Sequence, residues 1–266
     1  MIIEIDNINV PEVAAYASLT ETQLRHGNDS VEGYFIAESP KVIKVAISKG
    51  YEPESILCER KHITGDAHEI ISMFPEIKIF TGTRETLQSL TGYKLTRGVL
   101  ALMKRKPLPS LRFLCGQSRL LCVLHGVTDT TNIGSIFRSA SALGVDGIVL
   151  SKDTCDPLNR RSVRVSMGTV FTVPWTWLEN SIEDLKEYGF ATAALALSEN
   201  SISLDNRILK QQEKLAVVFG TEGDGLPTKV IGECDFVVKI PMFHGVDSLN
   251  VGAAAAVTFW ELRKTK

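Results

Sequence analysis

Short hydrophobic runs alternate with amphipathic stretches along the C-terminal half of the chain. Each run has the length of one strand, and the stretches between the runs carry apolar residues at helical spacing. Because strands that alternate with helices form βαβ units, this pattern predicts an α/β domain with a mostly parallel sheet covered on both faces. The expected strands are residues 121–124, 148–150, 193–197, 216–219 and 236–240.

The N-terminal half shows the same alternation in a smaller α/β unit. Its first expected element is a helix over residues 9–26, with Asn9 as the cap and Pro11 in the first turn. Residues 104–109 are polar and contain two prolines, as is typical of a domain boundary. We therefore expect a domain over residues 1–106, a linker over 107–118 and a second domain over 119–266. Further expected elements are the strands 34–37, 55–58, 78–80 and 98–103 and the helices 40–49 and 66–73.

A helix with one apolar face is predicted just after the first strand of the second domain. Apolar residues recur at intervals of three and four from Ile133 to Leu143. Asn132 is expected at the N-cap, and Gly144 is a suitable C′ residue. Since successive helical residues are about 100° apart, Arg138 projects almost opposite the apolar stripe. Its guanidinium is therefore available to a ligand or to solvent.

A glycine-rich loop follows the strand at 216–219. Gly220, Gly223 and Gly225 occupy it, and Glu222 lies between them. Glycines after a strand let the backbone approach a ligand closely, and the exposed N–H groups suit polar or anionic groups. The loop matches neither the P-loop nor the dinucleotide-binding fingerprint, which argues against other nucleotide-dependent α/β enzymes. Taken alone, it could also be an ordinary turn.

The last strand ends at Pro241, and an alanine-rich helix follows a short loop. Ser248 is expected to cap this helix, which would begin with Leu249, Asn250 and Val251. Small side chains allow another backbone to come close, so we expect tight packing of the helix. By themselves, Ser248 and Asn250 fit a plain structural cap.

Composition and charge narrow the possible partners. The chain has 44% hydrophobic and 23% charged residues and a net charge of −2, so a nucleic acid would have to meet a local basic patch. Residues 84–119 supply such a patch, which is either a solvated face or a site of phosphate contact. Arg160, Arg161 and Arg164 form a second basic face with the same two interpretations.

The five cysteines form no C-x-x-C pair and have no histidines at ligand spacing, which predicts reduced thiols, a cytoplasmic protein and no metal site. The N-terminus does not have the pattern of a secretory signal, and no apolar stretch reaches transmembrane length, so we expect no membrane partner.

Three motifs in order resemble those of the SpoU/TrmH branch of the knotted RNA methyltransferases, over roughly residues 118–264. The resemblance implies a deep trefoil knot, S-adenosylmethionine as cofactor, a ribose 2′-hydroxyl of RNA as methyl acceptor and a homodimer. The matching residues are Asn132, Gly134 and Arg138; then Gly220, Glu222, Gly223 and Gly225; then Ile240, Pro241 and Met242 followed by Ser248, Leu249, Asn250 and Val251.

The N-terminal unit is similar to the L30e-like substrate-binding domain that precedes many of these enzymes, on the runs at residues 35–38 and 91–101. Since that module resembles a ribosomal protein, rRNA is favoured over tRNA as the partner. The base and the position of the target nucleotide stay open.

The resemblance also assigns roles to individual residues. It implies that Leu197, Gly220, Ile240 and Leu249 hold the cofactor, largely through main-chain groups. The implied catalytic residues are Asn132, Arg138, Glu222, Ser248 and Asn250. Because guanidinium groups do not deprotonate in proteins, we expect Arg138 to clamp a phosphate and stabilise the developing alkoxide rather than to act as a base.

The chain departs from the family pattern at several positions. Thr130 follows Asp129 where the family commonly has a proline, Ser135 replaces a frequent alanine, and Asp247 and Gly252 replace frequent serines. None of these changes removes a group that the chemistry needs. The alternative to an active enzyme is a non-catalytic RNA-binding relative, which would be expected to have lost some of the implied catalytic residues.

Overall fold

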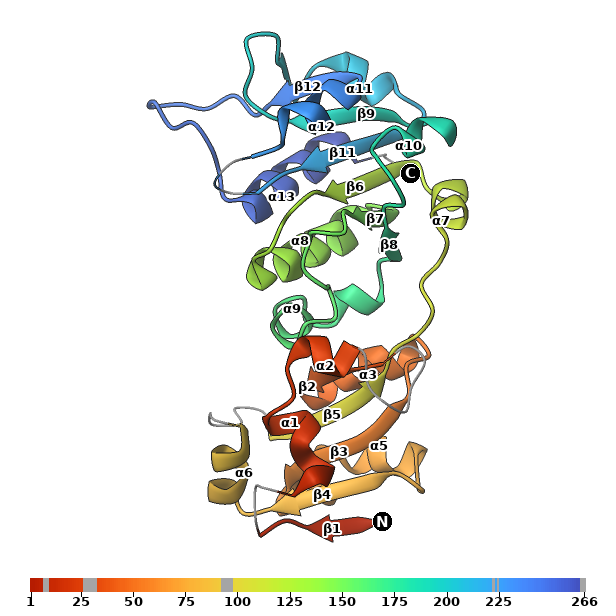
Figure 1. The fold of residues 1–266 in the computed structure, drawn as a ribbon, viewed down its shortest axis with the longest axis vertical. Coiled ribbons are helices and arrows are strands. Elements are labelled where there is room, and N and C mark those ends of the chain that lie inside the picture. The colour runs from red at the N-terminus through yellow and green to blue at the C-terminus, as the bar shows by residue number, and fades with distance from the viewer. Residues whose placement is uncertain (7–9, 26–32, 92–97, 222, 224, 264–266) are drawn as a thin grey trace. The chain divides into compact units, whose positions relative to one another are not determined.

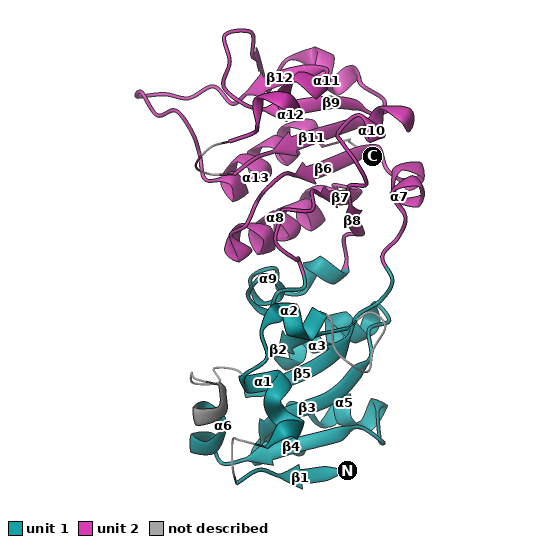
Figure 2. Cartoon of the chain, in the orientation of Figure 1, with its two compact units in different colours: residues 1–107, 158–171 teal, residues 108–157, 172–266 magenta. Residues whose placement is uncertain are grey.

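The computed structural model describes residues 1–6, 10–25, 33–91, 98–221, 223 and 225–263. The chain forms two compact units, shown in different colours in Figure 2. Unit 1 consists of Met1–Pro107 together with Leu158–Phe171, and unit 2 consists of Leu108–Pro157 together with Thr172–Lys266. Each unit is described by itself.

Unit 1 is built on a five-stranded mixed sheet with the order β1-β4-β3-β5-β2. Strands β1, β3 and β4 are parallel to one another, whereas β5 runs antiparallel to β3 and β2. The four strands expected in this half are all present, and β1 was not predicted. The bounds are β1 (Ile2–Glu4), β2 (Tyr34–Glu38), β3 (Pro53–Glu59), β4 (Lys78–Gly82) and β5 (Val99–Lys104).

The helix expected over residues 9–26 is interrupted, and its expected cap, Asn9, lies outside the described residues. A short 3-10 turn and α1 end near Ser18, and a new helix, α2, begins at Glu21. Thr20 and Gln23 explain the restart, because each accepts a hydrogen bond from the other's backbone N–H, at 3.2 and 2.8 Å. This reciprocal capping box begins a helix rather than continuing one. The helices of unit 1 before residue 107 are η1 (Pro11–Val13), α1 (Ala14–Ala17), α2 (Glu21–Arg25), α3 (Pro40–Ser48), α4 (Arg60–Ile63), α5 (His68–Met73) and α6 (Arg84–Thr91).

The segment 158–171 packs against the N-terminal sheet of unit 1, although it belongs to the C-terminal half of the sequence. It contains α9 (Arg160–Val165) and η2 (Thr169–Phe171). The Phe171 ring packs against those of Phe35 and Tyr51, with centroids 5.5 and 5.0 Å apart. Arg160 and Arg164 each lie 3.8 Å from the buried carboxylate of Glu38. Two of the three arginines of this basic segment therefore neutralise a buried charge.

Unit 2 contains a seven-stranded sheet with the order β10-β12-β9-β11-β6-β7-β8 (Figure 1). Every pairing in it is parallel, as predicted; β11, for example, pairs with β6 from Leu215↔Leu120 to Phe219↔Leu124. The short strands β8 and β10 were not predicted. The bounds are β6 (Leu120–Leu124), β7 (Gly147–Leu150), β8 (Trp175–Trp177), β9 (Ala191–Leu195), β10 (Ile202–Ser203), β11 (Leu215–Phe219) and β12 (Phe236–Lys239).

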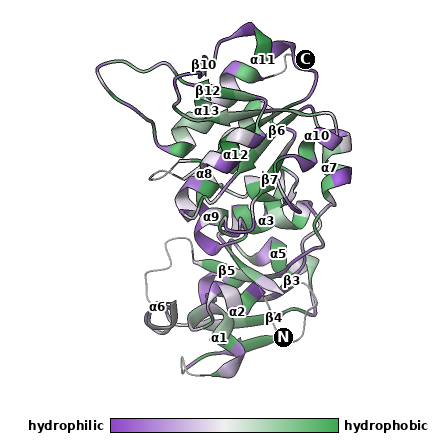
Figure 3. Cartoon of the chain, turned by 45° about the horizontal axis from the view of Figure 1, so that its top comes forward, coloured by the Kyte–Doolittle hydropathy of each residue, from purple (hydrophilic) through white to green (hydrophobic). Residues whose placement is uncertain are grey.

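Helices cover this sheet, and apolar side chains fill the space between the layers. Figure 3 shows the strands of this sheet as mainly hydrophobic. Side chains of Val123, Val149 and Val218 belong to one buried cluster. Outside residues 158–171, the helices after Pro107 are α7 (Leu111–Gln117), α8 (Thr130–Leu143), α10 (Asp184–Glu187), α11 (Arg207–Gln211), α12 (Thr228–Glu233) and α13 (Val251–Leu262).

The expected linker at 107–118 contains helix α7. Ser110 caps it by accepting a hydrogen bond from Phe113 N at 3.2 Å. Leu111, Leu114 and Cys115 are buried in the core cluster of unit 2. The segment is therefore a structured part of unit 2 rather than an irregular connection. The trefoil knot and the L30e-like character of the N-terminal unit stay predictions.

Among the described residues, no helix is long and apolar enough to cross a membrane. Within the same part of the chain, no group of three or more histidine, cysteine or acidic side chains is arranged so that it could hold a metal ion. All five cysteines are free thiols; Cys58, Cys115 and Cys122 are buried, and Cys155 and Cys234 are half-buried. Burial raises the pKa of Cys58 to about 12 and that of Cys115 to about 11.

Candidate functional site

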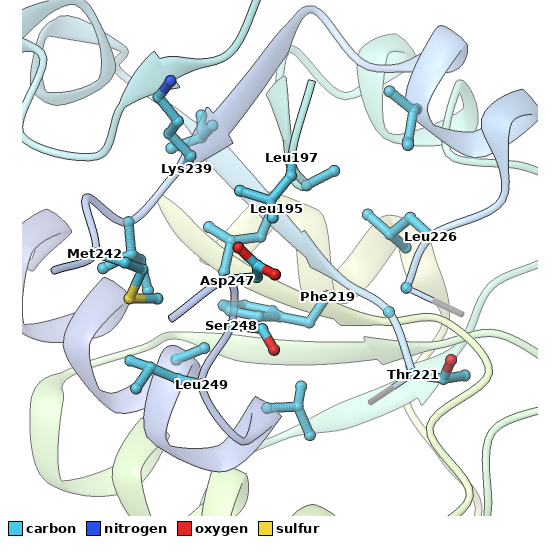
Figure 4. A pocket seen from close by; sticks show the side chains of 18 of the residues that line it. Leu195, Leu197, Phe219, Thr221, Leu226, Lys239, Met242, Asp247, Ser248 and Leu249 are labelled. Carbon is cyan, nitrogen blue, oxygen red and sulfur yellow. The ribbon is translucent and has the colours of Figure 1, made fainter. Parts of the chain in front are cut away.

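A cavity of about 400 Å³ opens where three neighbouring strands of unit 2 end (Figure 4). Its walls come from the residues that follow β9, β11 and β12 and from the segment that leads into α13. Ligands of parallel α/β sheets bind at this edge, outside the carboxyl ends of the strands. The four residues expected to hold the cofactor, Leu197, Gly220, Ile240 and Leu249, line the cavity together with Ser248.

The glycine-rich loop forms one wall of this cavity by folding back on itself. Thr221 N donates a hydrogen bond to Gly225 O at 3.2 Å, and Gly225 has a φ of +68°, which favours glycine. A Cβ at Gly220 would lie 2.6 Å from Leu226 N and closer still to the Gly225 carbonyl. Only glycine therefore fits at position 220 without a shift of the backbone. Glu222, expected to be catalytic, lies outside the described residues.

Helix α8 begins earlier than expected. Its N-cap is Asp129, whose Oδ1 accepts hydrogen bonds from Thr131 N at 2.6 Å and Asn132 N at 3.0 Å. The prediction of Asn132 as the cap is therefore wrong, because a carboxylate three residues earlier satisfies the first free N–H groups of the helix. Asn132 instead lies in the first turn and is buried. At the other end, Gly144 adopts the left-handed conformation expected of it, with φ of +77°.

Helix α13 begins later than expected. Asn250 caps it, and its Oδ1 accepts hydrogen bonds from Gly252 N at 2.9 Å and Ala253 N at 3.3 Å. The prediction of Ser248 as the cap is therefore wrong. Asparagine and serine are equally good caps, so the sequence alone could not separate these two positions. Ser248 precedes the cap and lines the cavity.

The starts of α8 and α13 are joined by a side-chain hydrogen bond. Asn250 Nδ2 donates to Asn132 Oδ1 at 3.0 Å, across 118 positions of sequence. A Cβ at Gly252 would lie 2.5 Å from Ser135 Oγ, so the two helices pack closely at this point, as expected for an alanine-rich helix. Two of the expected catalytic residues, Asn132 and Asn250, thus meet directly and fix the loop that carries a third, Ser248.

Arg138 lies apart from this contact. It is exposed on α8, as its position opposite the apolar stripe predicted. No described residue forms a hydrogen bond or ion pair with it. The described part of one chain therefore does not bring Arg138 together with Asn132, Asn250 and Ser248.

Several cavity residues were not singled out from the sequence. Figure 4 shows the carboxylate of Asp247 and the hydroxyl of Ser248 beside the ring of Phe219, among apolar side chains. Thr221 and Lys239 also line the cavity, as does Met242 of the third motif. For Thr221, Lys239 and Asp247 the sequence signal is position, because each lies at or beyond the carboxyl end of a parallel strand or leads into the next helix.

The cavity suits a small organic molecule that has both apolar and polar parts. Leu195, Phe219 and Leu226 supply apolar surface, while the glycine loop brings main-chain groups to the wall. Lys239 and Asp247 are the charged side chains among its described lining residues. The fold and the cavity together define the C-terminal unit as an α/β ligand-binding domain.

Comparison with known proteins identifies the family. Residues 119–260 match the model of the SpoU rRNA methylase family, which covers more than half of the chain. An uncharacterized tRNA/rRNA methyltransferase of Mycobacterium bovis is 32% identical over 256 residues, covering 94% of this chain and 88% of that protein. The chain therefore belongs to the SpoU rRNA methylase family of RNA methyltransferases, and the family prediction is confirmed.

Solved structures share the fold along nearly the whole chain. The AdoMet-bound rRNA methyltransferase of Sinorhizobium meliloti has a TM-score of 0.82 at 23% identity and covers 98% of this chain and 97% of its own. A structure described as an RNA 2′-O ribose methyltransferase has a TM-score of 0.76 at 22% identity and covers 98% of both chains. At this level of identity the likeness supports the α/β fold.

Proposed function

We propose that this protein transfers the methyl group of S-adenosylmethionine to a ribose 2′-hydroxyl of RNA, with rRNA favoured over tRNA. The observation that carries the proposal is the convergence of the loops after β9, β11 and β12 on one cavity, which brings together residues of the second and third motifs. The names of the relatives support it, since one is bound to AdoMet and another is a ribose 2′-O enzyme.

The cavity residues fit this cofactor. Leu197, Gly220, Ile240 and Leu249 would hold it, the glycine through main-chain contact and the others through apolar surface and their backbone groups. A Cβ at Gly220 would meet the Gly225 carbonyl and Leu226 N, so glycine at this position lets the loop fold back and bring its main-chain groups to the cavity wall. When bound, S-adenosylmethionine supplies an electrophilic methyl group on a sulfonium. Asp247 and Lys239 offer charged partners for the ends of the bound molecule.

The remaining motif residues would act on the RNA. Arg138 is exposed and has no hydrogen-bond partner among the described residues, so its guanidinium can clamp a phosphate and stabilise the developing alkoxide. The hydrogen bond from Asn250 to Asn132 positions the loop that carries Ser248. Glu222 would position a donor group from the glycine loop. In this scheme the proton of the 2′-hydroxyl leaves through the phosphate or water.

A homodimer is part of the proposal. Helix α13 leaves an apolar face uncovered, with Val257 43% and Trp260 57% exposed and Ala253 on the same side. A second copy of the chain would bury this face. Pairing of two copies would also allow Arg138 of one to approach the cavity of the other.

The test combines cofactor binding with turnover. Titration calorimetry with S-adenosylmethionine should give a micromolar dissociation constant. Unmethylated rRNA from a strain lacking the gene should gain a 2′-O-methyl group when it is incubated with the purified protein and S-adenosylmethionine. Arg138→Ala should leave cofactor binding intact and lower turnover about 100-fold or more, the size of loss known for an oxyanion-stabilising donor. Arg207→Ala removes an equally exposed arginine on α11 and serves as the matched control.

The outcomes separate the alternatives. Undiminished turnover in a folded Arg138→Ala protein would remove Arg138 from the mechanism. Methylation of tRNA alone would reverse the choice of substrate. RNA binding without cofactor binding or methyl transfer would identify a non-catalytic RNA-binding relative.

A further inference from the structure

A second cavity, of about 430 Å³, lies at the same edge of the sheet in unit 2. The residues that follow β6, β7 and β8 form it together with α12. Its volume falls in the range of small-molecule sites. The proposed methyl transfer uses none of its residues.

Its lining combines an apolar floor with polar groups that can still bind a ligand. Leu178, Ile182 and Val230 are at most 7% exposed. The lining also includes the imidazole of His125 and the ammonium of Lys152, which form no hydrogen bond with any described residue. Such a combination suits a flat ring that has apolar faces and polar edges.

Asp153 is held in place at the wall of this cavity. The hydroxyl of Ser151 donates to its Oδ1, and that hydroxyl in turn accepts a hydrogen bond from Gly126 N at 2.9 Å. The Ser151 hydroxyl lowers the pKa of Asp153, so the carboxylate is charged at neutral pH. Oδ1 is thus engaged by Ser151, while the second oxygen lies beside Gly126 and the carboxylate lines the cavity.

The two cavities share a thin wall. A Cβ at Gly126 would lie 3.2 Å from Asp153 Oδ2 on the side of the second cavity and 3.3 Å from Thr221 Cγ2 on the side of the first. One glycine thus separates the residues that line them. A nucleotide whose ribose lay at the first cavity could place a base in the second, or a neighbouring nucleotide could do so.

We propose that the second cavity binds an RNA base that carries an exocyclic amino group, that is adenine, guanine or cytosine rather than uracil. This inference rests on the proposed function, because it takes the ligand to be part of the RNA substrate. Carboxylates accept hydrogen bonds from amino groups of bases, and Asp153 is a carboxylate that Ser151 holds at this cavity. The cavity is lined by Asp153, Glu179 and Glu233 against Lys152 and Lys229, so a bare phosphate would meet more negative than positive charge.

The experiment measures binding of GMP, CMP and UMP to the full chain by saturation-transfer NMR and by titration of assigned amide signals. AMP is left out because the first cavity is proposed to hold an adenosine. GMP or CMP should bind at least about fivefold more tightly than UMP, the lower end of the discrimination given by a good base contact. The shifted amides should include those of residues 151–153 and 178–182.

Asp153→Asn removes the charge with little change of shape and should weaken GMP or CMP binding at least about fivefold. Glu187→Gln makes the same change at an exposed site outside the cavity and should leave binding unchanged. Calorimetry of Asp153→Asn with S-adenosylmethionine should match the wild type. If S-adenosylmethionine does not bind the wild type, the proposed function fails whatever the nucleotides do.

Equal affinity for UMP, or base binding that Asp153→Asn does not change, would overturn the second-cavity proposal alone. Amide shifts confined to residues 195–197 and 219–221 would also overturn it, because they would place the nucleotide in the first cavity.

Discussion

The two cavities of unit 2 lie at one edge of one sheet, yet different kinds of chemical groups line them. The first is lined by glycine backbone and apolar side chains, and its charged residues among those described are Lys239 and Asp247. The second is lined by six ionisable side chains: His125, Lys152, Asp153, Glu179, Lys229 and Glu233. A ligand held by backbone requires glycines at fixed places, whereas a ligand held by side chains does not.

This difference explains why only the first cavity could be found from the sequence. A backbone-lined wall constrains residue type, so Gly220, Gly223 and Gly225 form a pattern that can be read. The second cavity is assembled from short loops after three strands, and charged loop residues are common on any surface. The predictions below test how far the two sites are independent.

The largest effect is expected from Gly220→Ala. A Cβ there would lie 2.6 Å from Leu226 N, so the loop must move and narrow the first cavity. We expect affinity for S-adenosylmethionine to fall at least about tenfold, or about 1.4 kcal/mol, as measured by calorimetry. GMP or CMP binding in the second cavity should change less than twofold.

Gly232→Ala is the matched control, because it adds the same methyl group to an exposed glycine with nothing within 4 Å. It should leave both ligands bound as in the wild type. Equal loss of both ligands in a folded Gly220→Ala protein would show that the cavities respond as one site.

The amino-acid sequence was sufficient to predict the longer strands of both units, because strand periodicity is a local signal, whereas the residues expected at the first cavity came from the resemblance to the family motifs. It misplaced both helix starts that support the site. In each case two capping residues lie within three positions, Asp129 and Asn132 or Ser248 and Asn250, and only tertiary contact selects between them.

Long-range packing also escaped prediction at the segment 158–171. Its arginines were expected to form a basic face, either solvated or in contact with phosphate, but Arg160 and Arg164 lie beside the buried Glu38. Glu38 is 122 positions before Arg160 in the chain, and no local pattern links them. The same holds for α7, whose few buried residues are too short a stretch to show helical periodicity.

A smaller effect is expected from Gly252→Ser, which introduces the serine that is frequent in the family. Its Cβ would lie 2.5 Å from Ser135 Oγ, and because this hydroxyl can rotate away we expect a cost of about 1 kcal/mol, the lower end for overpacking. Ser135 itself stands where alanine is frequent, so the two departures compensate each other across the helix contact. The double variant Ser135→Ala/Gly252→Ser should recover most of the free energy of unfolding lost by Gly252→Ser, measured by urea denaturation.

Ser135→Ala alone completes the cycle and removes only the hydrogen bond from Ser135 Oγ to Asn132 O, at 3.0 Å. Since Gly252 follows the residues of the first cavity, Gly252→Ser should weaken S-adenosylmethionine binding and leave nucleotide binding unchanged. Strictly additive losses in the double variant would contradict the proposed compensation.

The smallest effect is expected from Asp235→Asn, at a residue that lines neither cavity. Although burial acts to raise it, the pKa of Asp235 is lowered by the Lys186 ammonium, 2.9 Å away, and by the N–H and hydroxyl of Thr192. Because the folded-state pKa is the lower one, the carboxylate stabilises the fold above its unfolded pKa of about 4 and loses this effect as the pH falls through the folded value. The pair is partly exposed, so the variant should lose about 0.5 to 1 kcal/mol at pH 7.

Comparison with Asp153→Asn then separates two uses of a carboxylate with a lowered pKa. Both side chains accept a hydroxyl hydrogen bond, but both oxygens of Asp235 are bound by the protein, whereas Asp153 faces a cavity. Asp235→Asn should therefore lower the free energy of unfolding at pH 7 and leave binding in both cavities unchanged. Its difference in stability from the wild type should disappear as the pH falls below about 4. A stability difference of the same size at pH 3 and pH 7 would show that shape rather than charge holds Asp235 in place.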